Sequence, residues 1–173
     1  MVAKWADSGA PRGNEADMPP AKVWADNSVW RIGTPDLIVK TKDIVVKAGA
    51  PDWWGEIEPV AIPLDEDRYV AAVEIKEVND AALHNGGRDT VGGLFVWHHL
   101  IYRTQPGADY VPTDIETIAG SDNVVNWPVH EVGRNPDYFD PKAAVLLKKG
   151  SYIVSDSAHI HSGGRPNTDA VAR

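Results

Sequence analysis

The amino-acid sequence predicts an all-β fold: an antiparallel β-sandwich or jelly roll with long loops, preceded by an extended N-terminal arm. Three observations lead to this prediction. Short runs rich in β-branched residues recur along the chain, turn-rich loops separate them, and no long segment shows helical periodicity. This combination is typical of antiparallel sheets whose strands are joined over the surface.

Length and composition fit a single globular domain and exclude several kinds of function. The chain has 173 residues, of which 43% are hydrophobic and 24% charged, enough to bury a sizeable core. Its net charge of -8 argues against nucleic acid as a partner, because phosphates need a basic surface. The lack of cysteine excludes disulfides, thiolate metal sites and iron–sulfur clusters within the chain.

The first segment, residues 1–35, is rich in glycine, proline, aspartate and alanine, which break long elements. It is predicted to be an arm or linker, the tail of a preceding domain, and residues 3–7 could form the last turn of a helix. The N-terminus lacks the apolar core of a signal peptide, and no run is long enough for a transmembrane helix. We therefore expect a cytosolic protein or a piece of a longer exported one.

Residues 36–173 are predicted to form the β-sandwich domain. Two prolines in 58–64 suit an edge strand, because proline cannot donate to a sheet ladder. Residues 105–142 are expected to be one long irregular loop, and 148–150 a tight turn. The strands are expected at residues 37–40, 44–47, 58–64, 69–78, 93–104, 143–147 and 151–161.

Two histidine clusters stand out in the predicted strands. One is the adjacent pair His98 and His99 in an apolar run, and the other is His159 and His161, spaced by one residue. Alternation places His159 and His161 on one face of a strand, where they can chelate together. It sends His98 and His99 to opposite faces if the strand is regular. This pair can then share a metal only at a bulge or a strand end, or if one ring binds through Nδ1 and the other through Nε2.

Imidazole ligands without thiolate suit copper, zinc, nickel or iron, and the two clusters allow several three-histidine combinations. Four isolated polar rings in an apolar sheet would each need a partner, which favours a metal site over unrelated core histidines. His84 and His130 are expected to be loop residues, with His130 as a substitute fourth ligand. The paired Trp53 and Trp54 are expected to pack against the core rather than to stack on a sugar.

The histidine strands and their surroundings resemble the N-terminal half of the catalytic core of copper type II, ascorbate-dependent monooxygenases. The similarity is closest to bacterial relatives of peptidylglycine α-hydroxylating monooxygenase in multidomain exported proteins. The resemblance includes the pair in residues 96–100, the turn at 147–151 that leads to His159, and the approach in 127–136. Residues 159–165 resemble the bacterial His-Tyr-His-Pro-x-Gly-Lys motif, and 5–13 with 30–37 resemble the junction after a cytochrome c-like domain.

This resemblance implies a jelly-roll-like β-sandwich that binds one copper ion through His98, His99 and His159, with His161 as the next candidate. The implied role is one-electron cycling at a type 2 copper, and zinc is the alternative metal. The family's oxygen-activating second copper site needs a methionine, but the two methionines here, Met1 and Met18, lie in the arm. The chain is thus expected to be a monooxygenase-like half-domain rather than a complete enzyme.

The resemblance also implies a second copper domain or a cytochrome c-like domain as partner, and a periplasmic or extracellular location. Two other functions remain open. One is a non-catalytic β-sandwich that serves as a structural or interaction module. The other is a zinc hydrolase-like site, which ranks last because no general-base carboxylate adjoins the histidines in the sequence.

Overall fold

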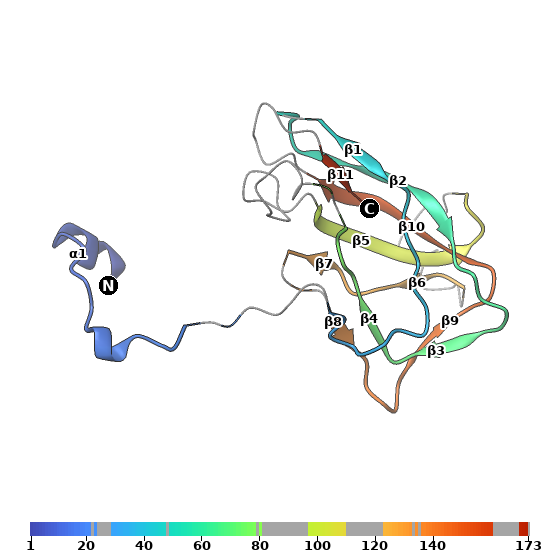
Figure 1. Cartoon of the computed structure of the whole chain (residues 1–173), viewed down its shortest axis with the longest axis horizontal. Coiled ribbons are helices and arrows are strands. Elements are labelled where there is room, and N and C mark those ends of the chain that lie inside the picture. The colour runs from blue at the N-terminus through green and yellow to red at the C-terminus, as the bar shows by residue number, and fades with distance from the viewer. Residues whose placement is uncertain are drawn as a thin grey trace.

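Strands make up most of the regular structure. The structure is a computed structural model and describes residues 1–21, 23, 29–47, 49–78, 80, 97–109, 123–132, 134, 136–160 and 170–172. Every strand pair in these ranges is antiparallel, which confirms the all-β prediction. The elements, drawn in Figure 1, are α1 (Val2–Asp7), the 3-10 helix η1 (Glu15–Asp17), β1 (Ile44–Val46), β2 (Trp53–Ala61), β3 (Arg68–Val70), β4 (Ala72–Glu74), β5 (Trp97–Pro106), β6 (Val125–Asn126), β7 (His130–Glu131), β8 (Pro136–Tyr138), β9 (Val145–Leu147), β10 (Ser151–Ile160) and β11 (Ala170–Ala172).

The largest sheet has the strand order β2-β10-β5-β6, and β7 pairs with a further part of β5. β5 and β10 have ten residues each, and β10 lies between β5 and β2. Elsewhere in the described chain, β1 pairs with β11, β3 with β9 and β4 with β8. This pairing fits several antiparallel architectures, so the jelly-roll arrangement stays a prediction.

The strands expected from the longest apolar runs are present. The expected strand 93–104 is β5, and 151–161 is β10, with residues 93–96 and 161 outside the described residues. The tight turn between β9 and β10 is also present, where Gly150 adopts a φ of 77° that favours glycine. β2 is an edge strand, as its Pro59 predicted, but it begins at Trp53, five residues before the expected start.

The predicted strand at 37–40 is wrong, because this segment has no ladder partner among the described residues. Its alternating side chains still behave as the pattern suggests. Leu37 and Val39 are partly buried against the core, whereas Ile38 is exposed. Alternation therefore reports one buried face here, while strand pairing also needs an available neighbour.

Two further expectations need correction. The single strand predicted at 69–78 is divided at Ala71 into β3 and β4, which pair with different strands. The Ala71 carbonyl accepts a hydrogen bond from the Phe139 amide, which marks the change of partner. The loop predicted at 105–142 contains β6, β7 and β8, and strands of two or three residues are too short to show a periodic pattern.

The hydrophobic core lies against one face of the large sheet. Alternation along β5 places Leu100 and Tyr102 on this face, and Ala158 of β10 lies opposite Leu100. Ile160 at the end of β10 belongs to the same cluster. The other face of β5, called the polar face below, carries His99, Arg103 and Gln105 together with the exposed Ile101.

Tyr102 provides a test of this core at alkaline pH. Burial raises the pKa of its phenol above 10, and the nearby Asp137 carboxylate adds to the effect. A raised folded-state pKa contributes stability that is complete below the unfolded value and is lost as pH rises through the folded value. We expect the free energy of unfolding to fall by about 1.4 kcal/mol per pH unit above about pH 10 through this group.

Denaturant unfolding of the wild type and Tyr102→Phe from about pH 8 to about pH 11 measures this contribution, because phenylalanine cannot ionise. Above about pH 10, the free energy of unfolding should fall less steeply with pH in the variant than in the wild type. Parallel pH profiles for the two proteins would mean that the Tyr102 phenol is solvated in the folded state.

The end of the predicted arm is hydrogen-bonded to strands β4 and β8, whereas its beginning is exposed. Helix α1 is exposed along its whole length, and Figure 1 draws it apart from the sheets. Near the end of the arm, the buried Glu74 carboxylate accepts hydrogen bonds from the Arg31 and Ile32 amides, at 2.6 and 3.1 Å. Tyr138 donates to the Arg31 carbonyl at 2.8 Å. Residues 31–32 are therefore fixed to β4 and β8.

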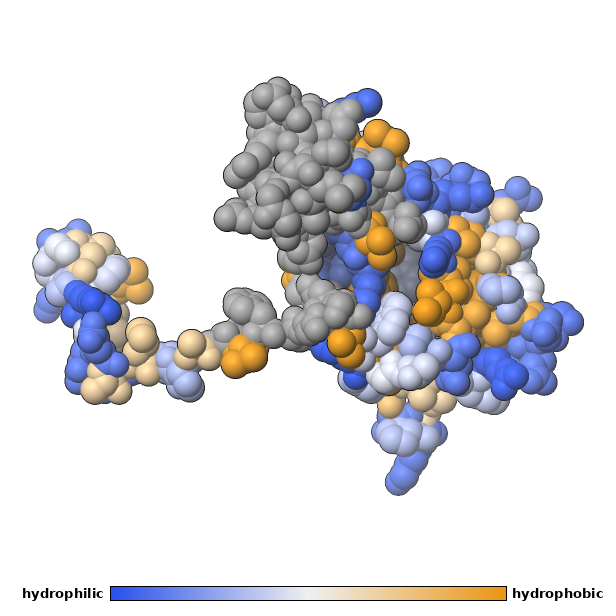
Figure 2. Space-filling model, viewed as in Figure 1, coloured by the Kyte–Doolittle hydropathy of each residue, from blue (hydrophilic) through white to orange (hydrophobic). Residues whose placement is uncertain are grey.

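The described part of the surface is mainly hydrophilic on the face shown in Figure 2, with a smaller hydrophobic patch on the body. This agrees with the excess of 25 acidic over 17 basic residues. Within the described ranges, no helix combines the length and apolar character needed to cross a bilayer.

Candidate metal centre

Strands β5 and β10 bring two of the predicted ligands together. In their antiparallel ladder His99 lies directly opposite His159, so both side chains project from the same face. On the other side of β10, His159 pairs with Trp54 of β2. A row of three rings therefore crosses three adjacent strands on the polar face of the sheet.

His98 reaches the same place through a β-bulge. The register changes from His159 opposite His99 to Ile160 opposite Trp97, so His98 is an extra residue without a partner on β10. Bulges re-aim a side chain that a regular strand would send to the other face. Of the arrangements that would let adjacent histidines share a metal (a bulge, a strand end or unlike ring nitrogens), the structure has the bulge.

The bulge is held by hydrogen bonds on both sides. The Glu77 carboxylate accepts a hydrogen bond from the Trp97 amide at 2.9 Å, directly before His98. The His98 carbonyl accepts from the Val132 amide at 3.2 Å, directly after β7. These contacts fix the backbone around His98, and neither Glu77 nor Val132 was identified from the sequence.

The Nδ1 atoms of the three histidines converge. His159 Nδ1 lies 2.9 Å from His98 Nδ1 and 3.3 Å from His99 Nδ1. One ring nitrogen from each of the three residues lies within 4.8 Å of the other two. Nitrogens bound to one metal at about 2.0–2.1 Å lie about 2.9–3.4 Å apart at ordinary coordination angles, so these separations fit a shared ion.

The tautomer that the hydrogen-bond partners of His159 imply also favours a shared ion. His159 Nε2 lies 3.2 Å from a carboxylate oxygen of Asp52, so Nε2 is the nitrogen that donates. In the neutral ring, Nδ1 then has one lone pair and no hydrogen. That lone pair faces two imidazole nitrogens and can accept from only one of them. A cation at the centre of the cluster uses all three lone pairs.

Trp54 covers one side of the cluster. Its indole stacks on the His159 ring with centroids 4.1 Å apart and planes 14° apart, and more distantly on His99 at 5.9 Å. The expectation that Trp53 and Trp54 pack against the core is wrong, because both are exposed and neither belongs to the core cluster. Trp54 stacks on the histidine rings instead. Trp54 remains 54% exposed, so the cluster lies near the surface.

The environment keeps His98 in the form that binds metals. Burial lowers the pKa of His98 below 6.5, and the neighbouring His99 and His159 lower it further. Asp52 and Glu131 act in the opposite direction with smaller effect. A neutral imidazole at neutral pH offers a lone pair, whereas an imidazolium would repel a cation.

The remaining histidines were predicted with mixed success. His84 and His161 lie outside the described residues, so the choice between His159 and His161 as third ligand stays a prediction. The expectation that His130 is a loop residue is wrong, because it lies buried in β7. It pairs with Leu100, which places it on the sheet face opposite His99 and away from the three-histidine cluster.

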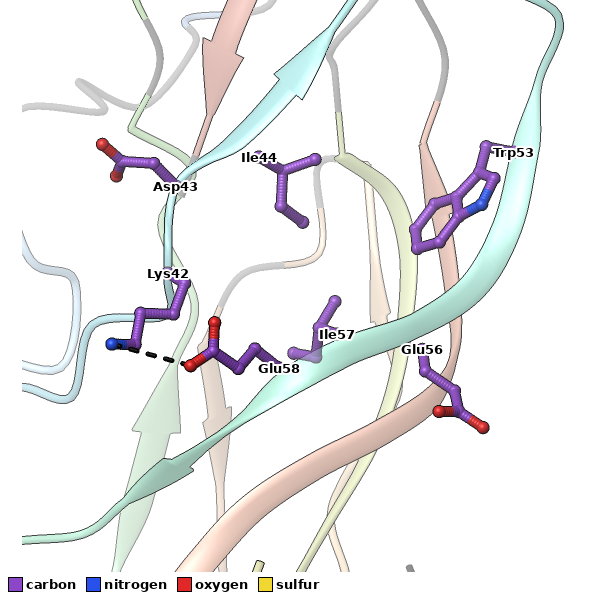
Figure 3. A pocket seen from close by; sticks show the side chains of 7 residues that line it. All are labelled: Lys42, Asp43, Ile44, Trp53, Glu56, Ile57 and Glu58. Carbon is purple, nitrogen blue, oxygen red and sulfur yellow. Dashed lines mark ion pairs between the residues drawn. The ribbon is translucent and has the colours of Figure 1, made fainter.

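A separate hollow of about 250 Å³ lies beside β1 and β2. Both charged and apolar side chains line it, and two of the lining residues, Lys42 and Glu58, form an ion pair at 3.7 Å. Its lining residues, shown in Figure 3, are Lys42, Asp43, Ile44, Trp53, Glu56, Ile57 and Glu58. The clustered histidines are absent from this lining, so the hollow is not the space above the metal centre.

The donor set determines what the site can bind. Three imidazoles, with neither thiolate nor carboxylate among the grouped ligands, suit copper or zinc and leave room for a further ligand. Two neighbours of the cluster, Asp52 and Trp54, were not predicted as parts of it, because their position depends on how β2 pairs with β10. No family model, curated protein or solved structure matches the chain.

Proposed function

We propose that the chain is a type 2 copper domain of a monooxygenase-like protein, in which His98, His99 and His159 hold one ion that cycles between Cu(I) and Cu(II). The observation that carries the proposal is the convergence of three Nδ1 atoms, two of them 2.9 and 3.3 Å from the third. Packing in a sheet does not by itself require three histidine side chains to direct their ring nitrogens at one point, whereas binding of a shared ion does.

The chemistry of the donors supports copper in particular. Neutral imidazoles bind both Cu(I) and Cu(II), and they add no negative charge that would favour the divalent ion strongly. The adjacent pair His98 and His99, with His159, is also the ligand set that the resemblance implies. When bound, the copper would supply one-electron transfer, while β5 and β10 hold the ligands.

The proposed role is that of an electron-storing half-site. Met1 and Met18 lie in the N-terminal arm, so a second, oxygen-activating copper site with a methionine ligand would belong to another domain. The proposed partners are such a copper domain or a cytochrome c-like domain, in a longer exported chain or a complex. The proposed location is the periplasm or the extracellular space.

Copper titration followed by electron paramagnetic resonance tests the proposal. We expect one Cu(II) per chain with a type 2 signal that disappears on addition of ascorbate and returns on exposure to air. Zinc, added in competition, should displace Cu(II) only in large excess, because a given site of nitrogen ligands generally binds Cu(II) more tightly than Zn(II). Stoichiometric zinc binding without a copper preference would contradict the proposed redox role.

A further inference from the structure

One short segment contacts the ligand His159 twice. Asp52 directly precedes β2, and its carboxylate lies 3.2 Å from His159 Nε2, the nitrogen that faces away from the cluster. Two residues later, Trp54 stacks on the face of the same ring. His159 is therefore held at its edge and on its face by residues 52–54, and its orientation does not depend on its own strand alone.

We propose that Asp52 is a positioning residue for the metal centre: it fixes the Nε2–H tautomer of His159 and directs the Nδ1 lone pair at the ion. This inference rests on the proposed function and deepens it. Metal-bound histidines commonly donate their second ring N–H to a carboxylate, which sets the ring orientation and makes the ligand more basic. The pair of Asp52 and His159 has this arrangement, with Nδ1 toward the cluster and Nε2 toward the carboxylate.

The negative charge of Asp52 has a second consequence. It lies one imidazole ring away from the ion, and its attraction is stronger for Cu(II) than for Cu(I) because the divalent ion has twice the charge. The His159 side chain is 9% exposed and that of Asp52 is 63% exposed, so the carboxylate approaches the buried ring from the solvent side. Water screens the charge there, which limits the effect but does not reverse its sign.

Replacement of Asp52 by asparagine and by alanine separates the two roles. Asparagine retains an oxygen that accepts from Nε2 but lacks the charge, whereas alanine lacks both. The Cu(II) affinity of Asp52→Asn should fall about tenfold, the lower end of the range for lost outer partners, and its Cu(I) affinity should fall less. Asp52→Ala should lose affinity for both ions, and Asp52→Glu should restore part of the loss.

Competition titrations with chelators of known Cu(I) and Cu(II) affinity measure these changes. Glu56→Gln is the matched control, because it removes one exposed charge from β2 at a residue that lines the separate hollow beside β1 and β2. Wild-type protein is titrated first, so failure to bind copper at all would count against the proposed function alone. If the wild type binds copper and Asp52→Asn and Asp52→Ala bind it equally well, Asp52 has no positioning role. Equal losses for Cu(I) and Cu(II) in Asp52→Asn would overturn the assignment of a charge effect.

Discussion

Replacement of His98 by alanine is expected to abolish stoichiometric copper binding. The loss should exceed the roughly 10–100-fold that removal of an outer partner costs, because a direct ligand is removed. His98 is the bulged residue, and its Nδ1 makes the 2.9 Å approach to His159. The type 2 signal should disappear in this variant at copper concentrations that saturate the wild type.

The other histidines provide matched comparisons for this result. His99→Ala and His159→Ala should behave like His98→Ala, since their nitrogens complete the same group. His130→Gln should keep the signal, because His130 lies on the opposite face of the sheet. Circular dichroism of each variant separates loss of the ligand from loss of the fold. If His98→Ala binds one copper with wild-type affinity, the bulged residue His98 is not a ligand.

His161→Ala belongs in the same series because of its spacing from His159. If three ligands suffice, this variant should retain the signal with altered hyperfine structure at most. Loss of the signal together with a normal fold would instead assign a ligand role to His161.

The grouping of His98, His99 and His159 could be predicted from the sequence because its main signals are local. In a regular strand an adjacent histidine pair points to opposite faces, so a bulge, a strand end or unlike ring nitrogens must bring both rings to one ion. This condition follows from alternation alone. The strands themselves follow from the longest apolar runs, which became β5 and β10. Local sequence patterns thus indicate the candidate ligands and the strand irregularity that they need in order to meet.

The parts that were missed depend on long-range pairing. Asp52 and Trp54 reach His159 only because β2 pairs with β10 in one particular register, which no local pattern specifies. Glu77 is similarly distant in sequence from the strand start that it supports. The strand predicted at residues 37–40 was wrong for a related reason. The alternation of its side chains is correct, but no partner strand pairs with it in the described chain.

The core beneath the site gives the second large prediction. Ile160 is 2% exposed, ends β10 directly after His159 and lies opposite both Trp53 and Trp97. Replacement by alanine removes buried methyl groups and leaves a cavity between three strands. We expect Ile160→Ala to lower the free energy of unfolding by about 2–5 kcal/mol. Chemical denaturation of the metal-free protein measures this loss.

Ile38→Ala is the matched control, because the same side chain is removed from a position that is 50% exposed. Its effect should stay within about 0.5 kcal/mol, as is usual for surface substitutions. The comparison therefore isolates burial from residue type. A loss below about 1 kcal/mol for Ile160→Ala would mean that this end of β10 is solvated, which also contradicts the buried setting of His159.

Copper binding should distinguish the core from the site in the Ile160 variant. Ile160 and His159 are neighbours on one strand and project from opposite faces, so the cavity lies on the far side of the sheet from the three nitrogens. The variant should still bind one copper, and a ligand at 100 times its dissociation constant adds about 2.7 kcal/mol to folded-state stability. Copper should therefore recover a large share of the stability lost from the core. Failure to recover any would mean that the cavity has also displaced His159, and that the two faces of β10 are mechanically coupled.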